Sequence, residues 1–112
     1  MSGNEPEPFS VAVHDAGGRL VVVARGELDL ATAPELETLV LPPLNEGGSV
    51  VLDLRGLAFM DSTGVRVIVA AHLAAEENDG HFAVVRTPAD GPVGRVLEIS
   101  GLDGVLDVVD DV

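Results

Sequence analysis

The sequence predicts an α/β fold: one domain with a mostly parallel sheet of four to five strands and an antiparallel hairpin at its N-terminal edge. Three observations predict it. The chain has 112 residues, which suits a single core without disulfides or metal. Strand-like apolar segments alternate with helical ones, as in parallel sheets. A glycine pair between the first two apolar segments indicates a hairpin turn.

The first two strands follow a polar start. Residues 1–8 contain two prolines and predict a disordered arm, which leaves 9–112 as the folded domain. FSVAVHD (9–15) alternates polar and apolar residues, so that Phe9, Val11 and Val13 share one face of a strand. AGG at 16–18 forms the turn, and the valine-rich segment 19–29 predicts the second strand, antiparallel to the first.

A helix is predicted next. Thr32 is a suitable N-cap, with Pro34 in the first turn and Glu35 three residues after the threonine. We expect Pro42 and Pro43 to end or sharply kink this helix, because neither has an amide hydrogen.

The second half of the chain alternates strands with helices. The continuous apolar run in 49–56 predicts a central strand, and 81–86 predicts another strand of the same buried kind. Residues 65–78 predict a helix, with an apolar stripe formed by Val65, Ile68, Val69, His72 and Leu73. A shorter helix is predicted over 91–101, with Val93, Val96, Leu97 and Ser100 at helical spacing, and a last short strand within 102–112.

Composition excludes several classes of function. The formal net charge is −13, and all six basic residues are arginine. Such a surface repels nucleic acid and anionic lipid, and it favours a partner with a basic patch or simply keeps the protein soluble. There is no cysteine, which excludes thiol catalysis and thiolate metal sites. No apolar run is long enough to span a bilayer, and no signal peptide is evident, so we expect a cytoplasmic protein.

Sequence motifs give no sign of a catalytic or cofactor site. The chain lacks phosphate-binding glycine motifs and a nucleophile elbow, and His14, His72 and His81 have no partner at metal-ligand spacing. Asp53 and Asp61 could form a catalytic carboxylate pair or an aspartyl-phosphate site, but such a receiver site needs a lysine. We therefore expect no enzyme activity, cofactor or metal.

The corner LAFMDSTG (57–64) is the most conspicuous motif. Asp61, Ser62 and Thr63 all suit helix capping, which requires only one such residue. Gly64 would let another backbone approach the helix start. A phosphate on Ser62 would lie where the helix dipole and free amides favour an anion, and it would add about −1.5 to −2 charge beside Asp61. From the residues alone, capping is the favoured interpretation and a phosphorylation switch is the alternative.

Three blocks together resemble the anti-sigma factor antagonists, which carry the STAS domain. They are GELDLATAPEL (26–36), VVLDLRGLAFMDSTGVRVIVAAH (50–72) and RVLEISGLDGVLDV (95–108), in the order in which the family has them. The resemblance implies a small α/β fold with the helices on one face of the sheet. It implies a non-enzymatic protein that, when unphosphorylated, binds an anti-sigma factor of the serine-kinase type and so frees a sigma factor.

The resemblance also assigns roles to residues. It implies that Ser62 is the phosphoacceptor, that the kinase ends binding by phosphorylating it, and that a serine phosphatase restores binding. Asp61 and Asp29 would contact the partner, and Thr63 and Gly64 would shape the recognised helix start. Phosphorylation at Thr63 stays open, as does a STAS module that senses a ligand or acts as a scaffold without a phosphorylation cycle.

Overall fold

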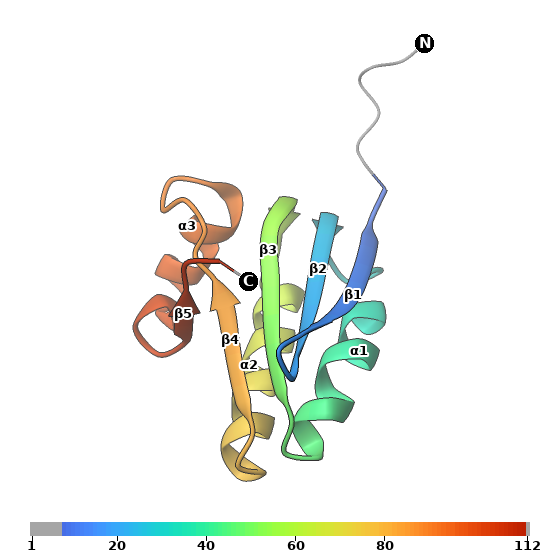
Figure 1. Cartoon of the computed structure of the whole chain (residues 1–112). Coiled ribbons are helices and arrows are strands. Elements are labelled where there is room, and N and C mark those ends of the chain that lie inside the picture. Colours follow the sequence, from blue (N-terminus) through green and yellow to red (C-terminus); the bar gives the residue numbers. More distant parts are fainter. Residues whose placement is uncertain (1–7, 112) are drawn as a thin grey trace.

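The computed structural model describes residues 8–111, so the arm predicted over 1–8 lies outside the described residues except for Pro8, which has no regular structure. The elements are β1 (Ser10–Ala16), β2 (Arg19–Leu28), α1 (Ala33–Asn45), β3 (Ser49–Met60), α2 (Ser62–Glu77), β4 (His81–Val85), α3 (Pro92–Ile99), a 3-10 helix (Leu102–Gly104) and β5 (Asp107–Val109). Figure 1 shows them in sequence colours.

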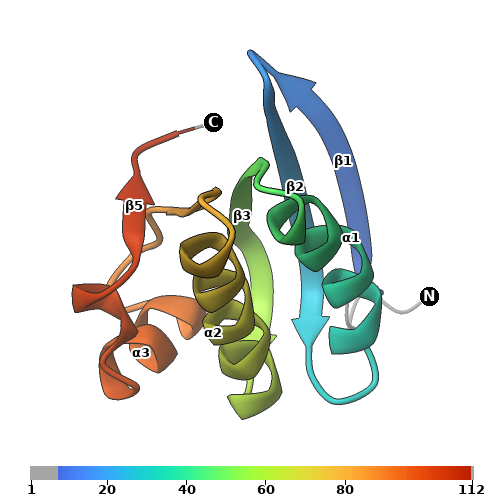
Figure 2. The same ribbon diagram turned by 90° about the horizontal axis from the view of Figure 1, so that it is seen from below.

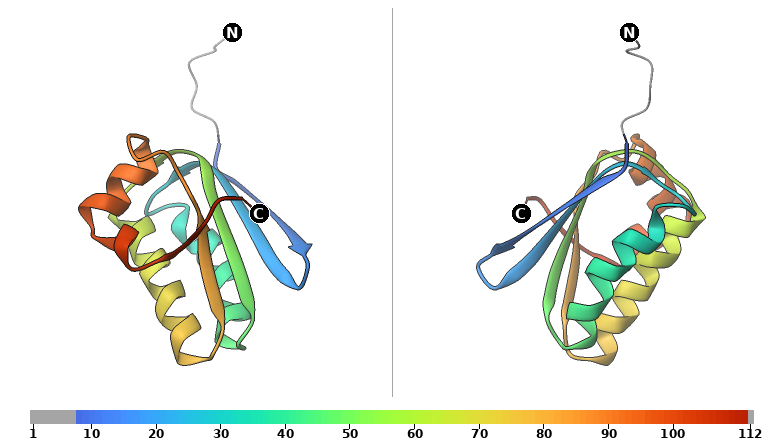
Figure 3. Two further views of the ribbon diagram at one scale, coloured as in Figure 1. Left: turned by 60° about the vertical axis from the view of Figure 1, so that its left-hand side comes forward. Right: turned by 90° about the vertical axis from the view of Figure 1, so that its right-hand side faces the viewer.

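The five strands form one sheet in the order β1-β2-β3-β4-β5. The β1–β2 pair is antiparallel, and every other pair is parallel, which confirms the predicted class. The hairpin turn uses Gly17 and Gly18 at φ of 62° and 86°, backbone angles that glycine adopts without strain. In Figure 3 the hairpin tip projects away from the helices, and Val13 is accordingly exposed rather than packed with Val11 on the core.

The helices lie side by side on one face of the sheet, as Figure 2 shows and as the resemblance implied. Fully buried side chains from both layers make up the core between them, including Val22, Leu28, Leu36, Leu52 and Ile68. None of the helices among residues 8–111 is both long and apolar enough to cross a membrane.

The central strand β3 is longer than predicted. It runs on past 56 to Met60 because β2 continues beside it, with Leu28 paired to Met60 after two register shifts. The corner therefore contains a single residue outside regular structure, Asp61, between β3 and α2.

Of the two effects predicted for Pro42 and Pro43, an end or a sharp kink of the first helix, the end is wrong, because α1 continues past both prolines to Asn45. Each proline forfeits one backbone hydrogen bond, but here both belong to the last turn, where other bonds secure the chain. The Pro43 carbonyl accepts hydrogen bonds from the amides of Glu46 (3.2 Å) and Gly48 (2.8 Å). Leu44, one residue further on, is fully buried and holds the turn against the core.

The predicted apolar stripe of α2 is also partly wrong. Leu73 is 49% exposed, whereas Val67, which the prediction left out, is buried together with Ile68. The remaining buried positions are small residues, namely Gly64, Ala71, Ala74 and Ala75. Small side chains let a helix approach the sheet closely, so the alanines of α2 face inward beside Val67 and Ile68, and Leu73 is left outside.

Candidate functional site

The predicted site residues gather at one end of the sheet. Asp29 follows β2, and Asp61 follows β3; because these parallel strands are neighbours, their carboxyl ends meet. A backbone hydrogen bond from the Asp61 amide to the Leu28 carbonyl (3.2 Å) ties the two loops together. We call this place, comprising Asp29, Asp61, Ser62, Thr63 and Gly64, the switch corner.

Asp61 is the N-cap of α2. Its Oδ1 accepts hydrogen bonds from the Thr63 amide (2.8 Å) and from Thr63 Oγ1 (2.6 Å). The hydrogen bond from the Thr63 side chain is the main cause that lowers the pKa of Asp61 below its usual range. The carboxylate is therefore ionised at neutral pH and holds a negative charge at the start of the helix, where the helix dipole favours it.

Ser62 and Thr63 differ in what their hydroxyls do. Thr63 is half-buried, and its hydroxyl is bonded to Asp61. Ser62 is the first residue of α2 and is exposed, and its hydroxyl has no hydrogen bond to any residue in the range 8–111. Within residues 8–111, the Ser62 hydroxyl is therefore unbonded, whereas the Thr63 hydroxyl is bonded, and Ser62 is open to a second protein.

Gly64 has a packing role. It is buried, and a Cβ there would come within 2.5 Å of Met60 Cγ and 2.9 Å of Leu28 Cδ2. The expectation that another backbone approaches at this point is wrong, because the neighbours are side chains that end β2 and β3. The glycine lets the helix begin directly on top of these two residues.

Asp29 builds the turn from β2 into α1. Its Oδ1 accepts hydrogen bonds from the amides of Ala31 (3.0 Å) and Thr32 (3.2 Å). Thr32 occupies the N-cap position of α1 but does not cap it with its side chain, contrary to the prediction. Its hydroxyl instead accepts a hydrogen bond from the Asp29 amide (2.9 Å) and donates one to the Glu27 carbonyl (2.8 Å).

Two exposed apolar residues beside the corner were missed by the sequence analysis. Leu30, at the tip of the Asp29 turn, is 76% exposed, and Phe59, near the end of β3, is 45% exposed. Leu30 could have been found, because an apolar residue inside a four-residue turn fits neither a helical nor a strand periodicity. Exposed large apolar side chains beside a polar corner are typical of protein–protein contact sites.

Asp53 and Asp61 do not form a carboxylate pair. They stand eight residues apart along β3, roughly 25 Å in an extended strand. Asp53 is buried in the middle of the sheet and is bound by Arg55. Among the residues that the structure describes, no cluster of His, Asp or Glu is arranged to hold a metal ion.

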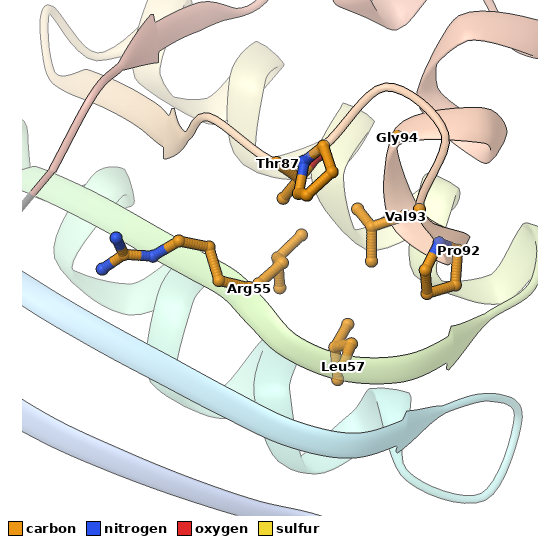
Figure 4. Close-up of a pocket in the computed structure, with 9 residues that line it drawn as sticks. Arg55, Leu57, Thr87, Pro92, Val93 and Gly94 are labelled. Atoms are coloured by element: carbon orange, nitrogen blue, oxygen red, sulfur yellow. The ribbon is translucent and has the colours of Figure 1, made fainter.

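A small, open hollow lies between β3 and the loop that leads into α3. Its lining is mostly apolar, with Leu57, Pro92 and Val93 facing one another in Figure 4, while the guanidinium of Arg55 points away. Thr87 is the one other polar side chain in this lining. The hollow contains none of the switch-corner residues.

Comparisons with known proteins show the family to which the chain belongs. The family model described as "Mlab, STAS domain" matches residues 11–109. An anti-sigma-B factor antagonist of Staphylococcus aureus is 35% identical over 85 residues, which are 74% of this chain and 76% of that protein.

Solved structures agree with the sequence comparison. The crystal structure of an anti-sigma factor antagonist from Mycobacterium paratuberculosis matches with a TM-score of 0.80 and 26% identity, covering 94% of this chain and 88% of the other. The unphosphorylated form of the anti-sigma factor antagonist SpoIIAA matches with a TM-score of 0.71 over 91% of this chain and 88% of the other. At 20% identity, the second likeness concerns the fold alone.

Proposed function

Because the chain belongs to the STAS domain family, we propose that it acts as an anti-sigma factor antagonist whose binding is controlled by phosphorylation of Ser62. The single observation that carries the proposal is the exposed hydroxyl of Ser62 at the start of α2, unbonded within residues 8–111, between an ionised Asp61 and a bonded Thr63. The similarity to an anti-sigma-B factor antagonist supports the choice of partner. The proposal includes no catalytic activity for this chain.

The unphosphorylated switch corner would be the docking surface. Leu30 and Phe59 offer apolar contact area beside it, and Asp29 and Asp61 surround it with negative charge. An anti-sigma factor that presents apolar side chains within a basic rim would complement both features.

Phosphorylation of Ser62 would change the charge of this surface without opening the helix. The phosphate adds about −1.5 to −2 charge to a corner that already holds Asp61. A partner built to contact a neutral serine would then have to desolvate a phosphate, which weakens binding. The folded protein would tolerate the group, because the helix dipole favours an anion at this end of α2 and the serine hydroxyl has no bond to lose among residues 8–111.

Thr63 is a poorer phosphoacceptor in this geometry. Its hydroxyl donates to Asp61 Oδ1 at 2.6 Å, so a kinase would first have to break the cap of α2. We therefore assign the modification to Ser62 alone, with the anti-sigma factor as the serine kinase and a separate serine phosphatase reversing the reaction.

The test is to map the phosphate. The protein is incubated with Mg-ATP and a serine-kinase anti-sigma factor encoded in the same genome, and the modified residue is identified by mass spectrometry. We expect phosphate on Ser62 in the wild type and in Thr63→Val, and no incorporation in Ser62→Ala. Incorporation in Ser62→Ala at the wild-type level would reject the assignment.

A STAS module that senses a ligand or acts as a scaffold is the alternative. It predicts no phosphorylation by any such kinase and no release of a sigma factor when the protein is mixed with the anti-sigma factor. Sigma-factor release is measured by size-exclusion chromatography of the three-protein mixture, and its presence would exclude the alternative.

A further inference from the structure

Three arginines lie on or directly after three neighbouring strands of the sheet. Arg25 lies on β2, Arg55 on β3 and Arg86 directly after β4. These are three of the six basic residues in a chain with 19 acidic ones. We call them the arginine cluster, and none belongs to the switch corner.

Arg55 is held in a fixed orientation. Its Nε and one terminal nitrogen bind the two carboxylate oxygens of Asp53 at 3.0 and 2.9 Å, the bidentate geometry that gives an arginine pair its directionality. Asp53 itself is only 6% exposed. Asp53 therefore fixes the orientation of the Arg55 guanidinium. The Arg55 side chain is 42% exposed, so its N–H groups that are not bound to Asp53 can contact a segment that lies on this face of the sheet.

Arg25 stands beside this pair. It lies across from Gly56 in the β2–β3 register, and a Cβ on that glycine would come within 2.9 Å of Arg25 Cγ. The glycine thus makes room for the arginine stem next to Arg55. The hydrogen bond from Arg55 is the main cause that lowers the pKa of Asp53, and Arg25 is close enough to Asp53 for its charge to help lower that pKa. Two guanidinium groups on adjacent strands therefore flank one buried carboxylate.

An acidic segment already occupies this surface. After β5 the chain crosses the sheet on the side away from α1 and α2, as Figures 1 and 3 show. Asp110 binds Arg86 at 2.9 Å, and Asp111 binds Arg55 at 3.1 Å. Both carboxylates are largely exposed, at 86% and 74% of their side chains.

We propose that the arginine cluster is a docking site for an extended acidic segment of a partner protein, and that Asp110 and Asp111 occupy it as an intramolecular competitor. The segment that follows β5, which we call the tail, contributes Asp110 and Asp111. It shows which chemistry fits this site, namely carboxylates along an extended chain. Its ion pairs are exposed and individually weak, so a partner segment with more carboxylates can displace it. This site lies on another face than the switch corner and does not depend on the proposed function.

The test uses a fluorescein-labelled peptide, GVDDVDDG, and its asparagine counterpart GVNNVNNG, in fluorescence anisotropy at low salt. The protein variants are Asp110→Asn/Asp111→Asn, which vacates the site, and the same double variant carrying Arg25→Ala or Arg86→Ala. These arginine variants leave the Asp53–Arg55 pair intact, so that the sheet keeps its buried ion pair. Arg95→Ala in the double variant is the matched control, because Arg95 is exposed on α3.

We expect the double variant to bind the aspartate peptide roughly fivefold to tenfold more tightly than the wild type does, since the competing carboxylates are gone. Arg25→Ala or Arg86→Ala should weaken that binding by about fivefold, and Arg95→Ala should leave it unchanged. No binding of the aspartate peptide by the double variant would overturn the proposal. Equal losses in Arg86→Ala and Arg95→Ala, or equal binding of both peptides, would also overturn it.

Discussion

Asp61, Ser62 and Thr63 are three neighbouring polar residues with three separate roles. Asp61 caps α2, Thr63 supplies both hydrogen bonds that orient the cap, and Ser62 makes no hydrogen bond to the described part of the chain. The sequence identified the corner and its candidate switch residue. It could not rank Ser62 above Thr63 as the free hydroxyl, because both are hydroxyl residues and only the side-chain orientation separates them.

At the residue scale, Gly64→Ala tests how tightly the helix start is packed. The new methyl group would overlap Met60 and Leu28, so we expect the free energy of unfolding to fall by about 1–3 kcal/mol. This loss occurs even though alanine has the better helix propensity by about 1 kcal/mol. Urea unfolding measures the change.

The control is Gly104→Ala, where a Cβ would meet nothing within 4 Å. That variant should stay within about 0.5 kcal/mol of the wild type. A Gly64→Ala variant as stable as the control would show that the helix start has room for a side chain, contrary to the geometry.

At the scale of elements, the alternation of strands and helices predicted every strand and α-helix from β1 to β5 but not the 3-10 helix Leu102–Gly104, and helix faces and ends were less well predicted. The face of α2 was misjudged because its buried side combines Val67 and Ile68 with small alanines, while the large Leu73 lies on the exposed side. A periodicity count gives more weight to Leu73 than to Ala71, although Ala71 is the fully buried one. The end of α1 was misjudged because Pro43 is secured by bonds from residues after the helix, which a local rule does not include.

The corrected face of α2 can be tested with two variants. Val67→Ala removes methyl groups from a site that is 1% exposed, so the free energy of unfolding should fall by about 1–3 kcal/mol. Leu73→Ala removes a larger group from a half-exposed site and should cost less than about 1 kcal/mol. Chemical unfolding of both variants gives the order, and a larger loss for Leu73→Ala would restore the original stripe.

At the scale of the whole molecule, the topology could be predicted and the path of the tail could not. The parallel order follows from the alternation of strands and helices. The crossing of the tail depends on Arg55 and Arg86, which are 56 and 24 residues away from the aspartates they bind. Helical and strand periodicities relate residues only a few positions apart, so they cannot predict such distant ion pairs.

The Asp53–Arg55 ion pair on β3 predicts that the stability of the fold depends on pH. The hydrogen bond from the Arg55 side chain is the main cause that lowers the pKa of Asp53 below its usual 3.8. A lowered pKa in the folded state means that the ionised group stabilises the fold above 3.8, and that this contribution is lost as the pH falls through the lowered value. We expect Asp53→Asn to be less stable than the wild type at pH 7, with the difference shrinking below pH 3.8.

Urea unfolding of both proteins at pH 7, 5 and 3.5 measures this difference. The values at pH 7 and pH 5 should agree, and only the most acidic point should show convergence. A difference that does not change with pH would mean that the carboxylate charge contributes nothing to the fold and that only its shape matters.

The proposed function requires that a phosphate on Ser62 weakens binding and leaves folding intact. The most direct measurement compares the unmodified and the Ser62-phosphorylated protein for the Kd of the kinase-type anti-sigma factor, by calorimetry, and for Tm, on the same samples. We predict a Kd at least about tenfold weaker on phosphorylation, with Tm changed by less than about 3 °C. An unchanged Kd, or a loss of binding accompanied by a fall in Tm of more than about 8 °C, would contradict a switch that acts on binding alone.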